Sequence, residues 1–212
     1  MTGREVKQAR PSDHRTDQKG ESKMNWTIPG TTLSARREDA AKMREQFQSL
    51  FLAGGIALSQ VTSITGLDPY MIQNWVKRGF LTKPTQKRYT LNQLCRIITI
   101  NMLKGVLPME RICGLLSYIN GRLDDETDDI IDDAELYFLF LRLAAHAREL
   151  DTRGAWTQAI AATLADYEEP IPGARERVNQ VLQVMLTAWV AARMAQEAEN
   201  MMEKLEFPGK GA

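Results

Sequence analysis

Apolar residues recur every three or four positions along most of this chain, and this spacing is typical of amphipathic α-helices. Glycine or proline stands at most of the breaks between these stretches. The pattern therefore predicts an all-α protein, with helices over residues 34–51, 59–65, 69–78, 91–104, 108–119, 134–150, 153–167 and 173–205.

The first 23 residues differ sharply in composition from the helical region that follows them. Residues 1–23 contain almost no large apolar side chain, so they cannot bury enough surface to offset chain entropy, and we expect them to be disordered. A basic DNA-binding arm is the alternative for this leader. Ser34 is the expected N-cap of the helix over 34–51, and Gly54–Gly55 is its expected end.

Residues 58–94 carry the most informative pattern. A short helix is followed by Gly66, and Asp68 with Pro69 then forms the start of a second helix, because an aspartate N-cap and a proline at the first position are typical of helix starts. Gly79 ends that helix. A polar, proline-marked stretch over 80–90 follows, and its tip over 83–88 is predicted to form an exposed basic hairpin, a small β-wing.

Basic and acidic residues are concentrated in different segments of the chain, although its net charge is zero. Residues 68–104 hold seven Lys or Arg and one acidic residue, whereas residues 124–135 hold eight acidic residues and no base. A basic lobe followed by an acidic one suggests a polyanion partner for the first lobe. The acidic run lacks the glycine that a calcium-binding EF-hand loop requires, so we interpret it as a solvated linker. Competition with DNA for the basic face is a further hypothesis for this run.

The second helix and the hairpin together resemble a DNA-reading unit. Gln73 and Asn74 lie on the outward side of the helix, and their amides can pair with adenine through two hydrogen bonds. Tyr70 can contact a phosphate or a thymine methyl, and the basic side chains can contact the phosphates of the DNA backbone. The predicted DNA-binding residues are Tyr70, Gln73, Asn74, Lys77, Arg78, Lys83, Lys87 and Arg88.

This arrangement resembles the MerR-type winged helix-turn-helix. The resemblance covers residues 56–119 and rests on Ile64–Asp68, Ile72–Trp75, Lys77–Leu81, Arg88–Leu91 and Leu94. The run QNWVKRGFLTKPTQKRYTLNQLCRI is also similar to a MerR-like family of uncharacterised proteins from Gram-positive bacteria, over about 33–145. Gln73 and Asn74 replace the usual arginine and tyrosine, so base preference does not carry over from the MerR family. The resemblance implies a DNA-binding transcriptional regulator.

The resulting domain prediction has five parts. They are a disordered leader over 1–23, an N-terminal helical segment over 24–55, the MerR-like winged helix-turn-helix over 56–122, an acidic linker over 123–133 and a C-terminal helical region over 134–212. The last region is either a domain that packs on itself, a dimer interface or an effector pocket. The apolar helix faces around Trp156 and Trp189 are compatible with each of these alternatives. Trp75 and Tyr89 are expected in the core.

The predicted partners are double-stranded DNA and a second copy of the chain, because readers of this type generally use two half-sites. The rival hypothesis is a protein-interaction module in which the basic face is incidental. We predict no enzyme activity, no cofactor and no metal, because His14, His146, Cys95 and Cys113 form no catalytic or ligand pattern. The expected location is the cytoplasm, because no apolar run approaches the length of a membrane span.

Overall fold

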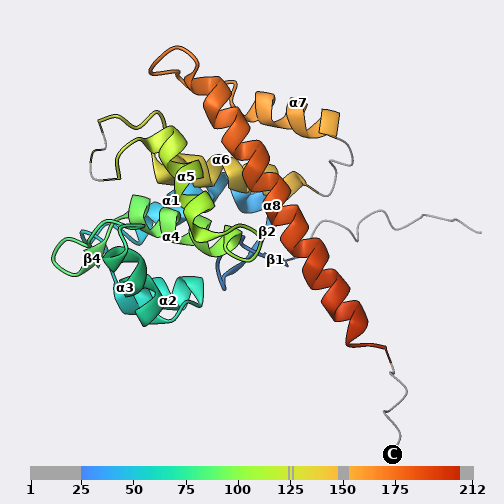
Figure 1. Cartoon of the computed structure of the whole chain (residues 1–212), viewed down its shortest axis with the longest axis horizontal. Coiled ribbons are helices and arrows are strands. Elements are labelled where there is room, and N and C mark those ends of the chain that lie inside the picture. Colours follow the sequence, from blue (N-terminus) through green and yellow to red (C-terminus); the bar gives the residue numbers. More distant parts are fainter. Residues whose placement is uncertain (1–24, 124, 126, 148–152, 206–212) are drawn as a thin grey trace, which may run out of the picture.

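The computed structural model describes residues 25–123, 125, 127–147 and 153–205. The described chain is mostly helical (Figure 1) and includes two small antiparallel sheets. The predicted all-α class with a small β element is thus confirmed at this level. The elements in chain order are β1 (Asn25–Thr27), β2 (Ser34–Arg36), the 3-10 helix η1 (Arg37–Lys42), α1 (Met43–Ser49), β3 (Ile56–Ala57), α2 (Leu58–Thr65), α3 (Pro69–Lys77), β4 (Arg88–Tyr89), α4 (Leu91–Leu103), α5 (Met109–Asn120), α6 (Asp133–His146), α7 (Arg153–Thr163) and α8 (Ala174–Met202).

The predicted helix over 34–51 is wrong in its first part. Ser34 does not cap a helix but lies in β2, which pairs with β1 so that Trp26 stands opposite Ala35. Gly30 makes the turn possible because its φ of +75° lies in the left-handed region. Helical structure begins only at Arg37, as a 3-10 helix that continues into α1. The range 24–55 is therefore a hairpin followed by a helix.

The pair α2 and α3 matches the predicted boundaries closely. Gly66 lies between them with a φ of +69°. Thr32 of the N-terminal segment donates its backbone N–H to the carbonyl of Ile64 at 2.8 Å and its hydroxyl to the carbonyl of Ser63, also at 2.8 Å. The N-terminal segment therefore packs against the end of α2 and satisfies carbonyl groups that a helix end leaves free. The short sheet β3–β4 pairs Ile56 with Tyr89 and brings the chain before α2 beside the chain after α3.

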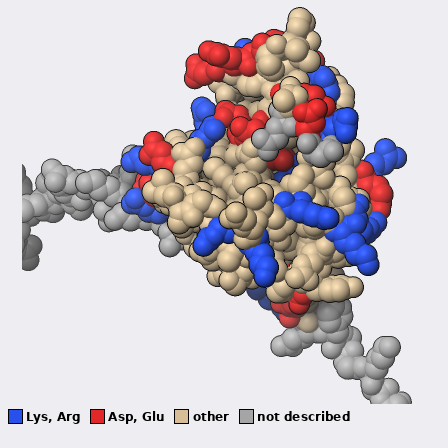
Figure 2. Space-filling model, turned by 90° about the vertical axis from the view of Figure 1, so that its left-hand side faces the viewer, with Lys and Arg blue, Asp and Glu red and all other residues tan. Residues whose placement is uncertain are grey.

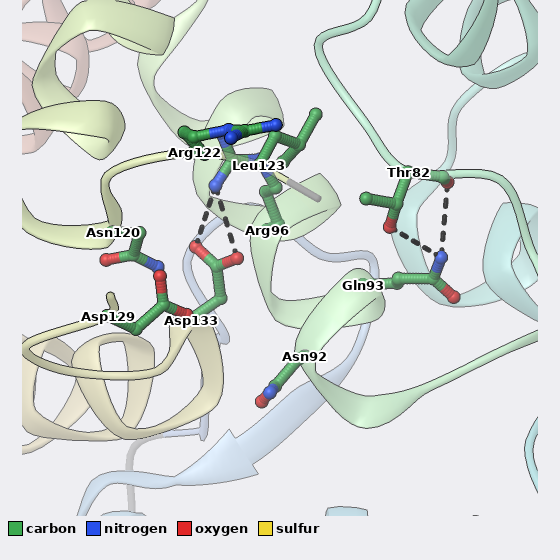
Figure 3. A pocket seen from close by; sticks show the side chains of 9 residues that line it. All are labelled: Thr82, Asn92, Gln93, Arg96, Asn120, Arg122, Leu123, Asp129 and Asp133. Atoms are coloured by element: carbon green, nitrogen blue, oxygen red, sulfur yellow. Dashed lines mark hydrogen bonds and ion pairs between the residues drawn. The ribbon is translucent and has the colours of Figure 1, made fainter. Parts of the chain in front are cut away.

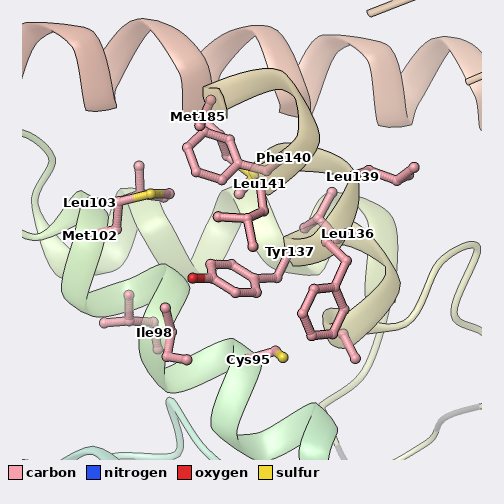
Figure 4. Packing of buried hydrophobic residues seen from close by; sticks show 14 of the residues in the cluster. Cys95, Ile98, Met102, Leu103, Leu136, Tyr137, Leu139, Phe140, Leu141 and Met185 are labelled. Atoms are coloured by element: carbon pink, nitrogen blue, oxygen red, sulfur yellow. The ribbon is translucent and has the colours of Figure 1, made fainter. Parts of the chain in front are cut away.

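The centre of the molecule is formed by α4 and α6, whose buried side chains pack against each other (Figure 4). Residues 93–100 of α4 and residues 136–141 of α6 are all buried, so both helices are covered on every side. The fully buried Tyr137 donates its hydroxyl to the carbonyl of Pro29 at 2.9 Å, which satisfies a polar group that would otherwise be costly to bury. One continuous core results, extending from Trp26 to Trp189.

The C-terminal helices complete this core. Trp189 of α8 packs edge-on against Phe140 of α6, with ring centroids 5.9 Å apart. The predicted acidic linker is not purely solvated, because Ile130 and Ile131 are buried and the N–H of Ile130 donates to the carbonyl of Ile119 at 3.0 Å. Among the described residues, no helix combines the length and apolar character needed to cross a lipid bilayer.

Two glycines with similar backbone angles test how tightly the N-terminal hairpin packs on α4. A Cβ on Gly30 would lie 2.4 Å from the carbonyl oxygen of Ile98, whereas a Cβ on Gly54, whose φ is +80°, would meet no atom within 4 Å. Gly54→Ala should therefore cost only left-handed strain of about 1 kcal/mol, and Gly30→Ala should cost about 2 kcal/mol more through overpacking. Urea unfolding of both variants measures the difference, and equal free energies of unfolding would contradict this packing.

Candidate functional site

The start of α3 is fixed by local interactions. The Asp68 carboxylate accepts the backbone N–H of Tyr70 at 2.7 Å, and Pro69 occupies the first helical position. Both features stabilise the free end of a helix, since the first N–H groups lack partners within the helix. The sequence prediction for this N-terminus is confirmed.

The two sides of α3 have opposite characters. Ile72 and Trp75 are buried against the core, as predicted, while the other side carries Tyr70, Gln73, Asn74 and Lys77. Tyr70 is 76% exposed, Gln73 and Lys77 are exposed, and Asn74 is half-buried. The structure gives these four side chains, which we call the α3 face, no hydrogen bond or ion pair to any described residue. Their polar groups are thus available to a ligand.

The basic turn, which we define as residues 83–88, stands beside the α3 face. Its two central residues, Gln86 and Lys87, both have positive φ values, +51° and +63°, and the N–H of Arg88 donates to the carbonyl of Thr85 at 2.9 Å. This is the geometry of a type I′ hairpin turn, which normally uses asparagine and glycine. Two side chains with a Cβ are therefore held here in a strained conformation, and such strain clusters at functional positions.

A hollow of about 380 Å³ separates α3 from the basic turn. Gln73 and Lys87 both line it, so one predicted base-reading residue and one predicted phosphate-binding residue share a single concave surface. The remaining lining residues are mostly apolar: Leu58, Val76, Pro84 and Tyr89. Burial raises the pKa of the Tyr89 hydroxyl.

Two of the predicted DNA-binding residues already have partners within the chain. The guanidinium of Arg78 lies 3.2 Å from the carboxylate of Glu110 and stacks over the ring of Phe80 at 4.5 Å. Arg88 donates to the carbonyl of Gly55 at 2.9 Å. Both side chains remain largely exposed. Lys83 and Lys87 are exposed as well. Figure 2 shows Lys and Arg side chains on the face of the molecule that corresponds to the left-hand side of Figure 1, where α3 and β4 lie.

Buried polar side chains of α4 hold the chain just after α3 (Figure 3). The amide nitrogen of Gln93 donates to the carbonyls of Thr82 and Lys83, each at 3.1 Å, and Arg96 donates to the carbonyl of Phe80 at 3.1 Å. Arg96 in turn pairs with Asp133 at 3.2 Å, where both side chains are largely buried. The base of the basic turn is therefore tied to both central helices.

The chain just before α3 is held by a third residue of α4. The amide nitrogen of Asn101 donates to the carbonyl of Thr65 at 3.0 Å and to the carbonyl of Gly30 at 2.9 Å. We call Gln93, Arg96 and Asn101 the α4 clamp. Sequence reasoning missed the clamp, although polar residues within an otherwise apolar helix were the signal that could have revealed it.

The basic and acidic lobes predicted from the sequence are partly joined through this clamp. Arg96 was counted in the basic lobe, but it is only 4% exposed and is paired with Asp133 from the acidic run. Other acids of that run are also used locally: Asp132 caps α6 through the N–H of Glu135, and Asp128 accepts the N–H of Arg122. The exposed basic side chains of the predicted lobe are therefore those at the end of α3, those of the basic turn and Lys104 at the end of α4.

The remaining candidate residues have structural surroundings. Cys95 is buried, and burial holds the pKa of its thiol well above the ordinary value, so it stays protonated and unreactive. Burial also raises the pKa of the Cys113 thiol. Within the part of the chain that the structure describes, no group of three or more His, Cys, Asp or Glu is placed to hold a metal ion. His14 and the leader over 1–23 lie outside the described residues.

Comparison with known proteins gives two matches. Residues 53–140 match a family described as "Domain of unknown function (DUF1836)", a range that includes α2, α3, the basic turn and most of α6. The chain is also similar to the Uncharacterized protein YkrK of Bacillus subtilis (strain 168), with 28% identity over 86 residues. That alignment covers 39% of this chain and 37% of YkrK. No solved structure matches this chain.

The strained turn can be relieved without touching the core. Replacing Gln86 with asparagine and Lys87 with glycine installs the preferred type I′ pair, so the double variant should be more stable by about 1 kcal/mol. Urea unfolding measures this gain, and Lys83→Gly, a lysine replaced at the start of the same turn, is the control that should bring no gain. A double variant that is less stable than the original chain would show that the left-handed geometry is not adopted.

Proposed function

We propose that this protein is a sequence-specific reader of double-stranded DNA that acts as a transcriptional regulator of MerR-like type. The observation that carries the proposal is the juxtaposition of the α3 face with the strained basic turn across one hollow. A helix fits the major groove of B-DNA, and a flanking basic loop then reaches the neighbouring backbone.

The α3 face has the chemistry that base reading requires. Gln73 and Asn74 each present a donor and an acceptor in one plane, which matches the exposed edge of adenine. Tyr70 exposes most of its ring in the first turn of α3, although an aromatic side chain is normally at least partly buried. A contact with a thymine methyl or a phosphate would cover this ring.

The basic turn has the chemistry that backbone binding requires. The side-chain ammonium groups of Lys83 and Lys87 are exposed and make no hydrogen bond or ion pair with any described residue, so neither must give up an internal partner to bind a phosphate. Arg78 and Arg88 would have to exchange the Glu110 carboxylate and the Gly55 carbonyl for phosphate oxygens. We therefore assign the main phosphate contacts to the lysines and a smaller contribution to the arginines.

The α4 clamp supports this function because it fixes the reading helix at both ends. Specific recognition needs side chains that keep their positions to within a fraction of an ångström, and rigid supporting hydrogen bonds provide this. Asn101 holds the chain before α3, while Gln93 and Arg96 hold the chain after it. The α3 face is thus presented in one orientation.

One feature favours a second candidate function. The hollow between α3 and the basic turn is lined mainly by Leu58, Val76, Pro84 and Tyr89, and an apolar hollow can also accept a side chain of a partner protein. A protein-interaction module would use the same surface without reading DNA.

Salt dependence separates the two functions. Binding of the full chain to fluorescent duplex DNA should weaken steeply with salt, and Lys87→Glu should lower the affinity about tenfold at low salt and reduce the salt slope by about one. Lys42→Glu changes a lysine of η1 outside the proposed surface and serves as the matched control, which should bind as the original chain does. Absence of duplex binding at low salt, or equal affinities of the two variants, would contradict the proposal.

A further inference from the structure

The hollow between α3 and the basic turn changes in character from its floor to its rim. Its floor is apolar and consists of the half-buried Leu58, Val76 and Pro84 and the buried Tyr89. Tyr89 is only 3% exposed, so its hydroxyl adds little polar surface to this floor. Gln73 and Lys87 are exposed and stand at the rim, one on α3 and one in the basic turn. A ligand of this hollow therefore meets apolar surface below and polar groups on two sides.

The size of the hollow is too large for the smallest groups of DNA. Pockets of about 300–1,000 Å³ accept whole small molecules, and this hollow measures about 380 Å³. A thymine methyl would leave most of it unfilled. A phosphate would lose its water against the apolar floor, and burying a charge without a partner is costly. The hollow is therefore complementary to an uncharged ring with an anionic group on either side, which is the chemistry of a sugar within a polynucleotide strand.

The proposed position of α3 on DNA brings such a strand to the hollow. A sugar–phosphate strand forms each wall between the major groove and the neighbouring minor groove of B-DNA. With α3 in the major groove and Lys87 at a phosphate of the groove wall, the strand that forms this wall runs between α3 and the basic turn. The hollow lies between the same two elements.

We infer that the hollow receives one deoxyribose of this strand, so that the protein selects DNA against ribose at a single sugar. This inference rests on the proposed DNA binding and adds a contact that depends on neither base sequence nor charge. The phosphates on either side of the sugar lie at the rim, where Lys87 supplies a positive charge and Gln73 supplies an amide donor.

The 2′ position of the sugar carries the discrimination. Deoxyribose has two hydrogens on C2′, whereas ribose has a hydroxyl group there, and this hydroxyl is what allows a protein to distinguish RNA from DNA. Against Leu58, Val76 and Pro84 the hydroxyl would lose its hydrogen bonds to water without gaining a partner. One unsatisfied polar group of this kind should weaken binding about tenfold.

A scan with single ribonucleotides tests the inference on the full chain and its preferred duplex, obtained by selection from a random pool. Each duplex carries one 2′-hydroxyl at a different nucleotide, and fluorescence anisotropy measures its affinity. For each bound copy of the chain we expect one nucleotide at which the hydroxyl lowers the affinity about tenfold. A 2′-fluoro nucleotide at the same position has a ribose-like sugar shape but no hydrogen to donate, so its duplex should bind within about twofold of the DNA duplex.

Two valine-to-threonine variants test whether the sensitive sugar lies in the hollow. Val76→Thr places a hydroxyl of almost the same shape on the floor, where it can pair with the 2′-hydroxyl. The ratio of deoxyribose to ribose affinity at the sensitive nucleotide should then fall from about ten to about two. Val106→Thr makes the same exchange in the turn between α4 and α5, where Val106 is 40% exposed, and should leave the ratio unchanged.

The outcomes distinguish this inference from the proposed function. A preferred duplex that is bound equally with a hydroxyl at every position would overturn the sugar contact while DNA reading stands, and would favour a side chain of a partner protein as the occupant of the hollow. A ratio that Val76→Thr leaves unchanged would also overturn the contact, because the sensitive sugar would then lie outside the hollow. A chain without any preferred duplex would overturn the proposed function and this inference with it.

Discussion

The structure depends on polar side chains of α4 that bind the backbone on either side of α3. Gln93 and Arg96 are buried and Asn101 is half-buried, and each donates to backbone carbonyls of these segments. A buried donor without a partner costs about 1–3 kcal/mol, so these contacts are strongly specified once α4 is covered by α6. The orientation of α3 is therefore set by the core itself rather than by a flexible linker.

The ion pair between Arg96 and Asp133 extends this arrangement to the C-terminal helices. Asp133 is the first residue of α6, so the chain after the basic turn and the start of α6 share one buried guanidinium. Loss of either partner would leave a buried charge uncompensated, which is strongly destabilising. The presumed boundary between a basic lobe and a separate acidic lobe is thus a point of close contact.

Local signals in the sequence were sufficient for some elements and insufficient for others. Gly66, Asp68 and Pro69 determine the start of α3 through their own backbone and capping preferences, and the structure confirms that start. The hairpin over 25–36 was missed because its turn depends on Gly30 packing against Ile98 of α4, a contact distant in sequence. Ala40, Met43 and Phe47 recur at helical spacing, and no local signal forbids a helix that begins at Ser34, so the sequence predicts a helix start that is too early.

The candidate site shows the same division. Exposure of Tyr70, Gln73 and Lys77 follows from helical periodicity and was predictable. The positive φ values of Gln86 and Lys87 could not be predicted from the sequence, because neither residue type favours the left-handed conformation. The hollow between α3 and the basic turn was also beyond prediction, because its walls come from three segments that only the folded chain brings together.

We propose that a rigidly held α3 and its basic turn form a surface that binds a particular DNA sequence. Selection of bound fragments from a random pool of duplexes, performed with the full chain, tests this claim most directly. We predict enrichment of one preferred sequence that contains adenine at positions contacted by α3. A pool that shows no sequence preference after repeated rounds would contradict the claim.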